Sequence, residues 1–421
     1  MRLIRTQGRS ARQAEAFLAQ LECRGGSSLD SVLPTVRKIL SDIRKQGDRA
    51  LVSYAKKFDN LNPNIPLLIS QEETAAAWQQ LDPSLKQSLQ TAAKNIRAFA
   101  QRQLPKSWQL ASAGLTTGQL VRPIESAGCY VPGGRHPLPS TMLMTVIPAQ
   151  VAGVPRIVVT SPRPAVETLA TAHLLGITEF YRIGGAHAIA ALAYGTESIP
   201  RVAKIVGPGN LYVTAAKREV AFDCAIDMLA GPTEIVVTSD NGIPANIASD
   251  LVAQAEHDPE ALAIFITTNQ ALAQQVIAET KQRSRNNPVA KQALKDNGYI
   301  FLASSKKEAQ VITNRLASEH LSVDSEADLV WIQNAGSVFI GNHSSQPMGD
   351  YISGPNHTLP TGGMATTRGG LSVNDFVKLI TVQQYTAKGL AILGPQAIRL
   401  AEAEGLTGHA EAIQARLASP E

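Results

Sequence analysis

The 421-residue chain is predicted to be an α/β protein with two doubly wound, incomplete Rossmann-like parallel-sheet domains and small helical extensions at both ends. Three observations predict this class. From residue 127 onward, short β-branched or aliphatic runs alternate with helix-length segments, a pattern typical of a parallel sheet covered on both faces. Hydrophobic residues make up 44% of the chain and charged residues 18%, as in a folded protein with a sizeable core. No fixed-period repeat or low-complexity tract interrupts the alternation.

Residues up to about 105 are predicted to be helical. The segments 31–45 and 48–58 carry apolar residues three and four apart, and Pro83 opens a long amphipathic segment. We assign residues 1–24 to an N-terminal helical extension. Residues 25–126 are grouped with 234–380 in a first α/β domain.

Two βα series follow. In the first, each of CYVPG, RIVVTSP, FYRIGG and KIVGPGN precedes a helix, and these units form a second α/β domain at 127–233. In the other series EIVVTSD, AIFITTN and YIFLASS precede helices, and SVFIG adds a further strand. Residues 381–421 are predicted to be a helical tail that packs on a partner subunit or folds back on its own chain.

Composition and charge exclude several classes of function. Lys and Arg exceed Asp and Glu by 39 to 35, a net charge of +4 that is too small and too dispersed for a polyanion binder. The aromatic content of 5% argues against a stacking platform for single-stranded nucleic acid. The most apolar long window, 142–161, contains two prolines and an arginine and does not fit a membrane span. We therefore expect no nucleic-acid partner and no membrane insertion.

The cysteines and the N-terminus indicate the compartment. Three scattered cysteines give neither a fully paired disulfide framework nor a thiolate metal site. The basic N-terminus fits a transit peptide or an ordinary helix start, and it lacks the apolar segment of a secretory signal. We expect a cytoplasmic protein.

Three glycine turns end strands of the 127–233 domain. They are Gly133–Gly134, Gly184–Gly185 and Gly207–Pro208–Gly209, each before a predicted helix. Free N–H groups and the helix dipole at such turns favour phosphate. No G-x-G-x-x-G fingerprint is present, and a single glycine turn is usually only a tight turn. Three such glycine turns along one sheet edge nevertheless favour a ligand at that edge. A dinucleotide is one possible ligand.

Polar residues in the second half of the chain are candidate metal ligands. Gln254 and His257 lie three apart on one predicted helical face and suit a borderline divalent ion, although taken alone such a pair is more often part of a solvated helix face. Asp350 lies in a long polar, glycine-rich segment, 341–370, of a kind that is usually functional. His409 lies in the helical tail. A set of nitrogen and oxygen ligands without thiolate would suit a metal that also holds substrate.

Glu319 and His320 form an adjacent acid and imidazole directly after a predicted helix. Histidine is the most common general base, and a partly buried glutamate can activate water. Such pairs are also frequent at exposed helix ends, so a pair without a catalytic role remains an open alternative. His357, within SGPNHTLP, is a further candidate in the polar segment.

Taken together, these segments resemble the histidinol dehydrogenase family from about residue 25 to His409. The matching strings are, in order, YVPGG with PLPSTMLMT, RIGGA with AIAALAYGTESIP, KIVGPGN, AGPTE, QAEHDP, SEHL, GDY followed by GPNHTLPTGG, GLSVNDF, and AEAEGL. The resemblance implies oxidation of L-histidinol through L-histidinal to L-histidine, the last steps of histidine biosynthesis. It implies NAD and one Zn²⁺ per subunit as cofactors. It also implies a homodimer whose C-terminal helices complete the neighbour's active site.

The resemblance assigns roles to individual residues. The implied metal ligands are Gln254, His257, Asp350 and His409. The implied catalytic pair is Glu319 and His320. The implied substrate contacts are the four metal ligands with Thr233, His320, His357 and Glu404. The implied NAD contacts, one on each glycine turn, are Tyr130, His187 and Asn210.

Two of these positions depart from the family pattern. Position 187 is usually Gln, and His187 is shorter and titratable, so the departure bears on cofactor affinity. Position 233 is usually Ser, and Thr233 keeps the hydroxyl.

Two other functions remain compatible with the residues alone. One is a zinc hydrolase in which metal-bound water, with Glu319 as base, cleaves an amide or ester. The other is a two-lobed metal-dependent binding protein that performs no chemistry.

Overall fold

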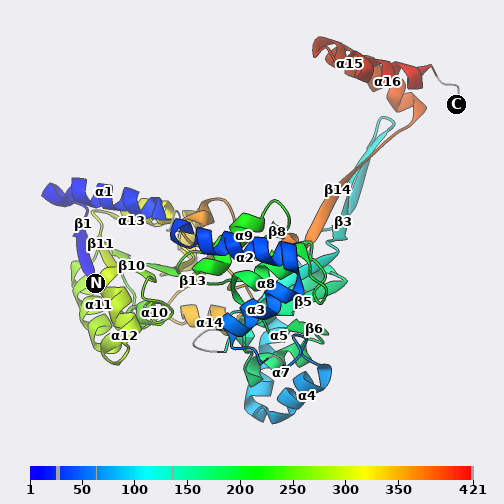
Figure 1. Cartoon of the computed structure of the whole chain (residues 1–421). Helices are drawn as coiled ribbons and strands as arrows, with labels where there is room; N and C mark the ends of the chain where they lie inside the picture. The colour runs from blue at the N-terminus through cyan, green and yellow to red at the C-terminus, as the bar shows by residue number, and fades with distance from the viewer. Residues whose placement is uncertain (25–28, 63, 134–136, 419–421) are drawn as a thin grey trace.

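Two parallel sheets and one antiparallel arm make up the molecule (Figure 1), and the computed structural model describes residues 1–24, 29–62, 64–133 and 137–418. From edge to edge, the six-stranded sheet consists of β1 (Arg2–Arg5), β11 (Gly298–Leu302), β10 (Leu262–Thr267), β9 (Glu234–Thr238), β12 (His320–Val323) and β13 (Ser337–Ile340). The five-stranded sheet consists of β6 (Glu179–Tyr181), β5 (Arg156–Thr160), β4 (Ser126–Tyr130), β7 (Lys204–Val206) and β8 (Ala225–Ile226). All pairings within these two sheets are parallel, which confirms the predicted doubly wound class.

Helices cover both faces of the six-stranded sheet. On one face lie α10 (Pro244–Ala255), α11 (Gln270–Arg283) and α12 (Pro288–Asp296), and on the other lie α1 (Ala11–Glu22) and α13 (Lys306–Leu316). The alternation of strand side chains decides which face each residue joins. Ile235 and Val237 of β9 enter the α10 side of the core, whereas Val236 enters the α13 side.

The early helices pack with the five-stranded sheet. That sheet is covered by α6 (Pro139–Ala152), α7 (Val166–Leu174), α8 (Gly185–Tyr194) and α9 (Leu211–Val220), and outside these lie α2 (Leu33–Gln46), α3 (Asp48–Asp59), α4 (Gln71–Gln80) and α5 (Pro83–Gln103). Val36 and Ile43 of α2 share a core with Ile189 and Leu192 of α8. The predicted grouping of 25–126 with 234–380 therefore differs from the packing, because the apolar faces of these helices complete the other sheet.

An antiparallel arm and a terminal strand were not predicted. The arm consists of β2 (Trp108–Ser112), β3 (Leu115–Pro123) and β14 (Val377–Tyr385), and at its tip lie α15 (Ala387–Ala403) and α16 (Thr407–Leu417) (Figure 1). Residues 1–24, expected to be helical, begin with β1, which pairs with β11 at the sheet edge. Four residues are too few for an alternating pattern to distinguish strand from helix.

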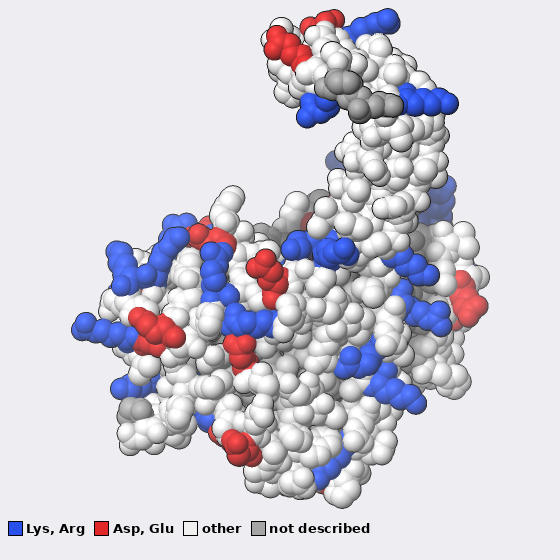
Figure 2. All heavy atoms as spheres, turned by 90° about the vertical axis from the view of Figure 1, so that its right-hand side faces the viewer, with Lys and Arg blue, Asp and Glu red and all other residues white. Residues whose placement is uncertain are grey.

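The space-filling view shows how the arm differs from the body (Figure 2). Basic and acidic side chains are interspersed over this face of the body, whereas the stalk of the arm is mostly uncharged. None of the helices in the described part of the chain has the length and hydrophobicity needed to cross a bilayer.

Candidate active site

The Glu319–His320 pair lies at the amino end of β12, beside the amino end of the neighbouring strand β9. Glu319 directly precedes β12 and His320 is its first residue, next to Glu234 at the start of β9. Both side chains are buried. The alternative of an exposed helix end is therefore wrong: α13 ends at Leu316, and the chain turns inward before the pair.

Hydrogen bonds hold the Glu319 carboxylate from one side. The hydroxyl of Thr233 donates to Oε2 at 2.5 Å, and the main-chain N–H of Glu234 donates to the same oxygen at 2.8 Å. The side-chain amide of Gln254 donates in turn to the Thr233 hydroxyl at 2.5 Å. Gln254, Thr233 and Glu319 are thus linked in one chain of hydrogen bonds.

The surroundings of His320 fix its tautomer. Nδ1 lies 3.0 Å from the carbonyl oxygen of Glu234, which can only accept, so Nδ1 carries the proton and donates. In the neutral ring Nε2 is therefore the proton-accepting atom. It is buried, has no hydrogen-bond partner among the described residues, and lies 3.6 Å from Oδ1 of Asp350.

Burial and mutual charge set the ionisation of the pair. Burial raises the pKa of Glu319, and the attraction of His320 and the hydrogen bonds from Thr233 and Glu234 offset this only in part. Burial lowers the pKa of His320, but the carboxylates of Glu319 and Asp350 outweigh it, so that pKa lies above its usual range. Each member of the pair stabilises the charged form of the other.

Two of the candidate metal ligands come from the end of α10. Gln254 is fully buried, and its Oε1 has no hydrogen-bond partner in the described part of the chain. An unpaired buried carbonyl oxygen is costly, and a divalent cation would satisfy it. His257, one turn further on, is exposed, and its Nδ1 lies 3.3 Å from the main-chain oxygen of Gln254.

Asp350 lies on the Nε2 side of the His320 ring, and His357 contacts the main chain of Asp350. Asp350 belongs to α14 (Gln346–Tyr351), and its Oδ2 accepts a hydrogen bond from Gln346 at 2.8 Å. Burial raises the pKa of Asp350, and the proximity of the His320 ring together with the charge of His357 more than reverses this. Nδ1 of His357 lies 2.8 Å from the main-chain oxygen of Asp350. Burial lowers the pKa of His357, with Asp350 opposing. The body of one chain thus brings His357, Asp350 and His320 together.

Glu404 and His409 do not lie with this group in a single chain. Both are exposed, Glu404 at the end of α15 and His409 in α16, at the tip of the arm (Figure 1). Across the described residues of one chain, no three His, Cys, Asp or Glu side chains are grouped so as to hold a metal ion. A complete four-ligand set therefore needs a donor from outside this group.

The three candidate NAD contacts lie at the carboxyl edge of the five-stranded sheet. The hydroxyl of Tyr130 accepts from the N–H of Gly185 at 3.1 Å, and Asn210 caps α9. His187 is buried, with Nε2 2.7 Å from Oδ2 of Asp59. Of the first predicted turn, Gly134 lies outside the described residues.

The comparisons with known proteins decide the family. The histidinol dehydrogenase family model matches residues 23–417. The chain belongs to the histidinol dehydrogenase family. It is 44% identical over 417 residues to the histidinol dehydrogenase of Listeria innocua, covering 96% of this chain and 97% of that protein. It is 43% identical over 419 residues to that of Methanosarcina barkeri, covering 96% of each.

Solved structures agree in fold. The crystal structure of histidinol dehydrogenase from Elizabethkingia anophelis matches with a TM-score of 0.92 and 36% identity, covering 99% of this chain and 98% of that one. An acetylating aldehyde dehydrogenase from Geobacillus thermoglucosidasius, at 12% identity and a TM-score of 0.50, covering 89% and 96%, shares the fold alone. The resemblance seen in the sequence is confirmed, and the hydrolase and the non-catalytic binding protein are set aside. Histidinol dehydrogenases are NAD-dependent oxidoreductases of histidine biosynthesis that act on an alcohol and an aldehyde.

Several residues that support the candidate site could not be identified from the sequence. Asp59 accepts from the N–H of Gly184 at 3.0 Å as well as contacting His187. Asp227 accepts from the N–H of Gly207 at 2.7 Å and pairs with buried Lys217. Each braces a glycine turn, but nothing in the local sequence marks a charged residue as buried.

Proposed function

We propose that two general bases divide the two oxidation steps between them. In the first step, Nε2 of His320 takes the hydroxyl proton of L-histidinol while a hydride leaves the carbinol carbon for NAD. In the second step, Glu319 deprotonates the water that adds to L-histidinal. His320 then takes the remaining hydroxyl proton of the hydrate as the second hydride leaves. The observation that carries the proposal is the burial of both bases side by side, with Nε2 of His320 lacking a hydrogen-bond partner among the described residues.

The proposed Zn²⁺ ligands are Gln254, His257, Asp350 and His409. The free Oε1 of Gln254 supports them, as does a donor set of nitrogen and oxygen without thiolate. Zn²⁺ is redox-inert, so when bound it would anchor the substrate's imidazole and amine rather than carry electrons. Substrate contacts are further proposed for Thr233, His320, His357 and Glu404. We place the enzyme in the cytoplasm.

We propose a homodimer in which the tail of each chain reaches the partner's site. Large apolar side chains of the arm are exposed to solvent: the exposed fraction is 64% for Leu110, 54% for Leu379 and 68% for Leu400. Several large apolar side chains exposed on one arm favour a protein partner. The uncharged stalk (Figure 2) supports a second copy as that partner, since homodimer interfaces are more apolar than the remaining surface. Such a partner would bring Glu404 and His409 to the group around Asp350.

One experiment tests the overall reaction. The purified enzyme is analysed for metal while NADH formation is compared with histidinol consumption. We expect about two NADH per histidinol and one Zn²⁺ per subunit. A ratio near one would mean that the aldehyde is released unoxidised, and a metal-free active enzyme would overturn the ligand assignment.

The Asp59 brace gives a prediction for cofactor binding. Asp59→Asn removes the charge that holds His187 and the N–H of Gly184, so the turn is expected to lose its fixed position. We expect the KM for NAD to rise about tenfold, the equivalent of roughly 1.4 kcal/mol. Metal content should stay unchanged. Asp42→Asn is the matched control, because within the described part of the chain the Asp42 carboxylate accepts hydrogen bonds only from Lys38 and Tyr54 and none from a glycine turn. Equal effects of both variants on the KM for NAD would contradict the proposed role of Asp59 in fixing the turn at Gly184.

A further inference from the structure

We infer that Arg24 and Glu234 are positioning residues that hold the catalytic pair through the main chain of Glu234. This inference rests on the roles proposed above for Glu319 and His320. The N–H of Glu234 donates to Oε2 of Glu319 at 2.8 Å, and its carbonyl oxygen accepts from Nδ1 of His320 at 3.0 Å. One residue therefore orients both bases, and a shift of its main chain would misplace both at once.

The side chain of Glu234 is anchored by Arg24 and by the main chain of Gly362. The guanidinium of Arg24 donates from Nε to Oε1 and from Nη2 to Oε2, each at 2.6 Å, and the N–H of Gly362 donates to Oε1 at 2.9 Å. The side chains of Arg24 and Glu234 are only 13% and 4% exposed. A paired carboxylate at this depth is held firmly, because a buried ion that loses its partner is costly.

The same guanidinium reaches the chain that leads to Glu319. Nη2 of Arg24 also donates to the carbonyl oxygen of Leu316 at 2.6 Å, three residues before Glu319, and Nη1 donates to that of Leu21 at 2.7 Å. Arg24 thus connects the segments that lead into β9 and β12. Only the planar fork of arginine supplies this set of donors in fixed directions, so lysine is not equivalent.

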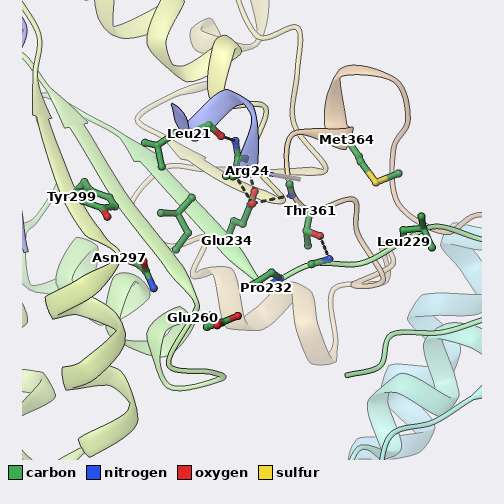
Figure 3. Close-up of a pocket in the computed structure, with 13 residues that line it drawn as sticks. Leu21, Arg24, Leu229, Pro232, Glu234, Glu260, Asn297, Tyr299, Thr361 and Met364 are labelled. Atoms are coloured by element: carbon green, nitrogen blue, oxygen red, sulfur yellow. Dashed lines mark hydrogen bonds and ion pairs between the residues drawn. The ribbon is translucent and has the colours of Figure 1, made fainter. Parts of the chain in front are cut away.

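A neighbouring cavity explains why packing alone does not hold Glu234. Figure 3 shows the carboxylate of Glu234 directed at Arg24 beside a pocket of about 170 Å³. Glu260, Asn297 and Tyr299 line the pocket on the side of the sheet. The pocket has room for a water-solvated carboxylate. Without Arg24 the Glu234 side chain can turn into this space, and its main chain can follow.

The first test compares two arginines that attach α1 to the body. Arg24→Met is expected to lower kcat for both oxidation steps by about 10- to 100-fold, the effect of a small misplacement of catalytic groups. The KM for histidinol and the Zn²⁺ content should stay unchanged. Arg24→Lys should fall between this variant and the wild type. Arg315→Met is the control, because Arg315 binds Glu15 and Glu22 of α1 but neither Glu234 nor the catalytic pair. A fall in kcat in the control as large as in Arg24→Met would reduce Arg24 to a structural anchor and overturn the inference.

A double-mutant cycle separates positioning from general loss of stability. In a Glu319→Gln background, Arg24→Met should have a smaller further effect on histidinal oxidation than in the wild type, because one of the two bases that it positions is already gone. Fully additive effects would overturn the inference while leaving the role of Glu319 intact. If Glu319→Gln alone left histidinal oxidation unchanged, the proposed base would be wrong. The Arg24 inference would then be judged on alcohol oxidation, which depends on His320. If Arg24→Met does not fold, Arg24→Lys serves in the same cycle.

Discussion

Glu319→Gln is expected to separate the two oxidation steps. Oxidation of histidinol should remain close to that of the wild type, because His320 alone takes the proton in that step. Oxidation of histidinal should fall by about 10²- to 10⁴-fold, the usual contribution of a general base. The glutamine side chain keeps an oxygen that can accept from Thr233 and from the N–H of Glu234, so the local structure should be retained. The measurements are the single-turnover rate of NADH formation with histidinol, which reports the first step, and steady-state NADH formation with histidinal.

His320→Asn provides the matching comparison. In the proposed mechanism His320 takes a proton in both steps, so both rates should fall. Unequal loss in Glu319→Gln together with parallel loss in His320→Asn would establish the division of roles. Equal slowing of both half-reactions by Glu319→Gln would contradict it, and would make Glu319 a partner of His320 rather than a base in its own right.

The alternation of strands and helices could be predicted from the sequence, but some individual strands could not. The runs EIVVTSD and AIFITTN correspond to β9 and β10, whose buried residues are almost all apolar. β12 begins with His320, directly after Glu319, and this polar start conceals a strand whose remaining residues are mostly buried. The arm was missed for another reason. All five residues of β2 are exposed, so no apolar alternation reveals them in a single chain.

The site shows a similar limit. Adjacent residues such as Glu319 and His320 can be seen as a pair in the sequence. The contacts that orient them come from far away: 210 residues separate Arg24 from Glu234, and 128 separate Asp59 from His187. These contacts depend on how β9, α1 and α3 are packed. That packing cannot be predicted from the local amino-acid composition. The resemblance supplied roles for residues at matching motifs, whereas Arg24 and Asp59 lie outside every motif.

His409→Ala is expected to remove Zn²⁺ and activity while leaving the fold intact. His409 is exposed on α16 within its own chain, so the substitution removes one of four proposed ligands and disturbs no core. Far-UV circular dichroism and size-exclusion chromatography should match the wild type. Metal analysis should show less than one Zn²⁺ per subunit, and excess Zn²⁺ should restore little activity, because three ligands bind more weakly than four.

Mixing this variant with His320→Asn tests whether the tail crosses between subunits. If each site combines the body of one chain with the tail of the other, a heterodimer has one intact site, made from the body of the His409→Ala chain and the tail of the His320→Asn chain. Random exchange in an equal mixture should then restore about one quarter of wild-type activity. The same mixture should contain no intact site if each tail serves its own body. Absence of recovery after verified subunit exchange would therefore mean that His409 returns to the chain that carries Gln254, and the exposed apolar arm would need another explanation.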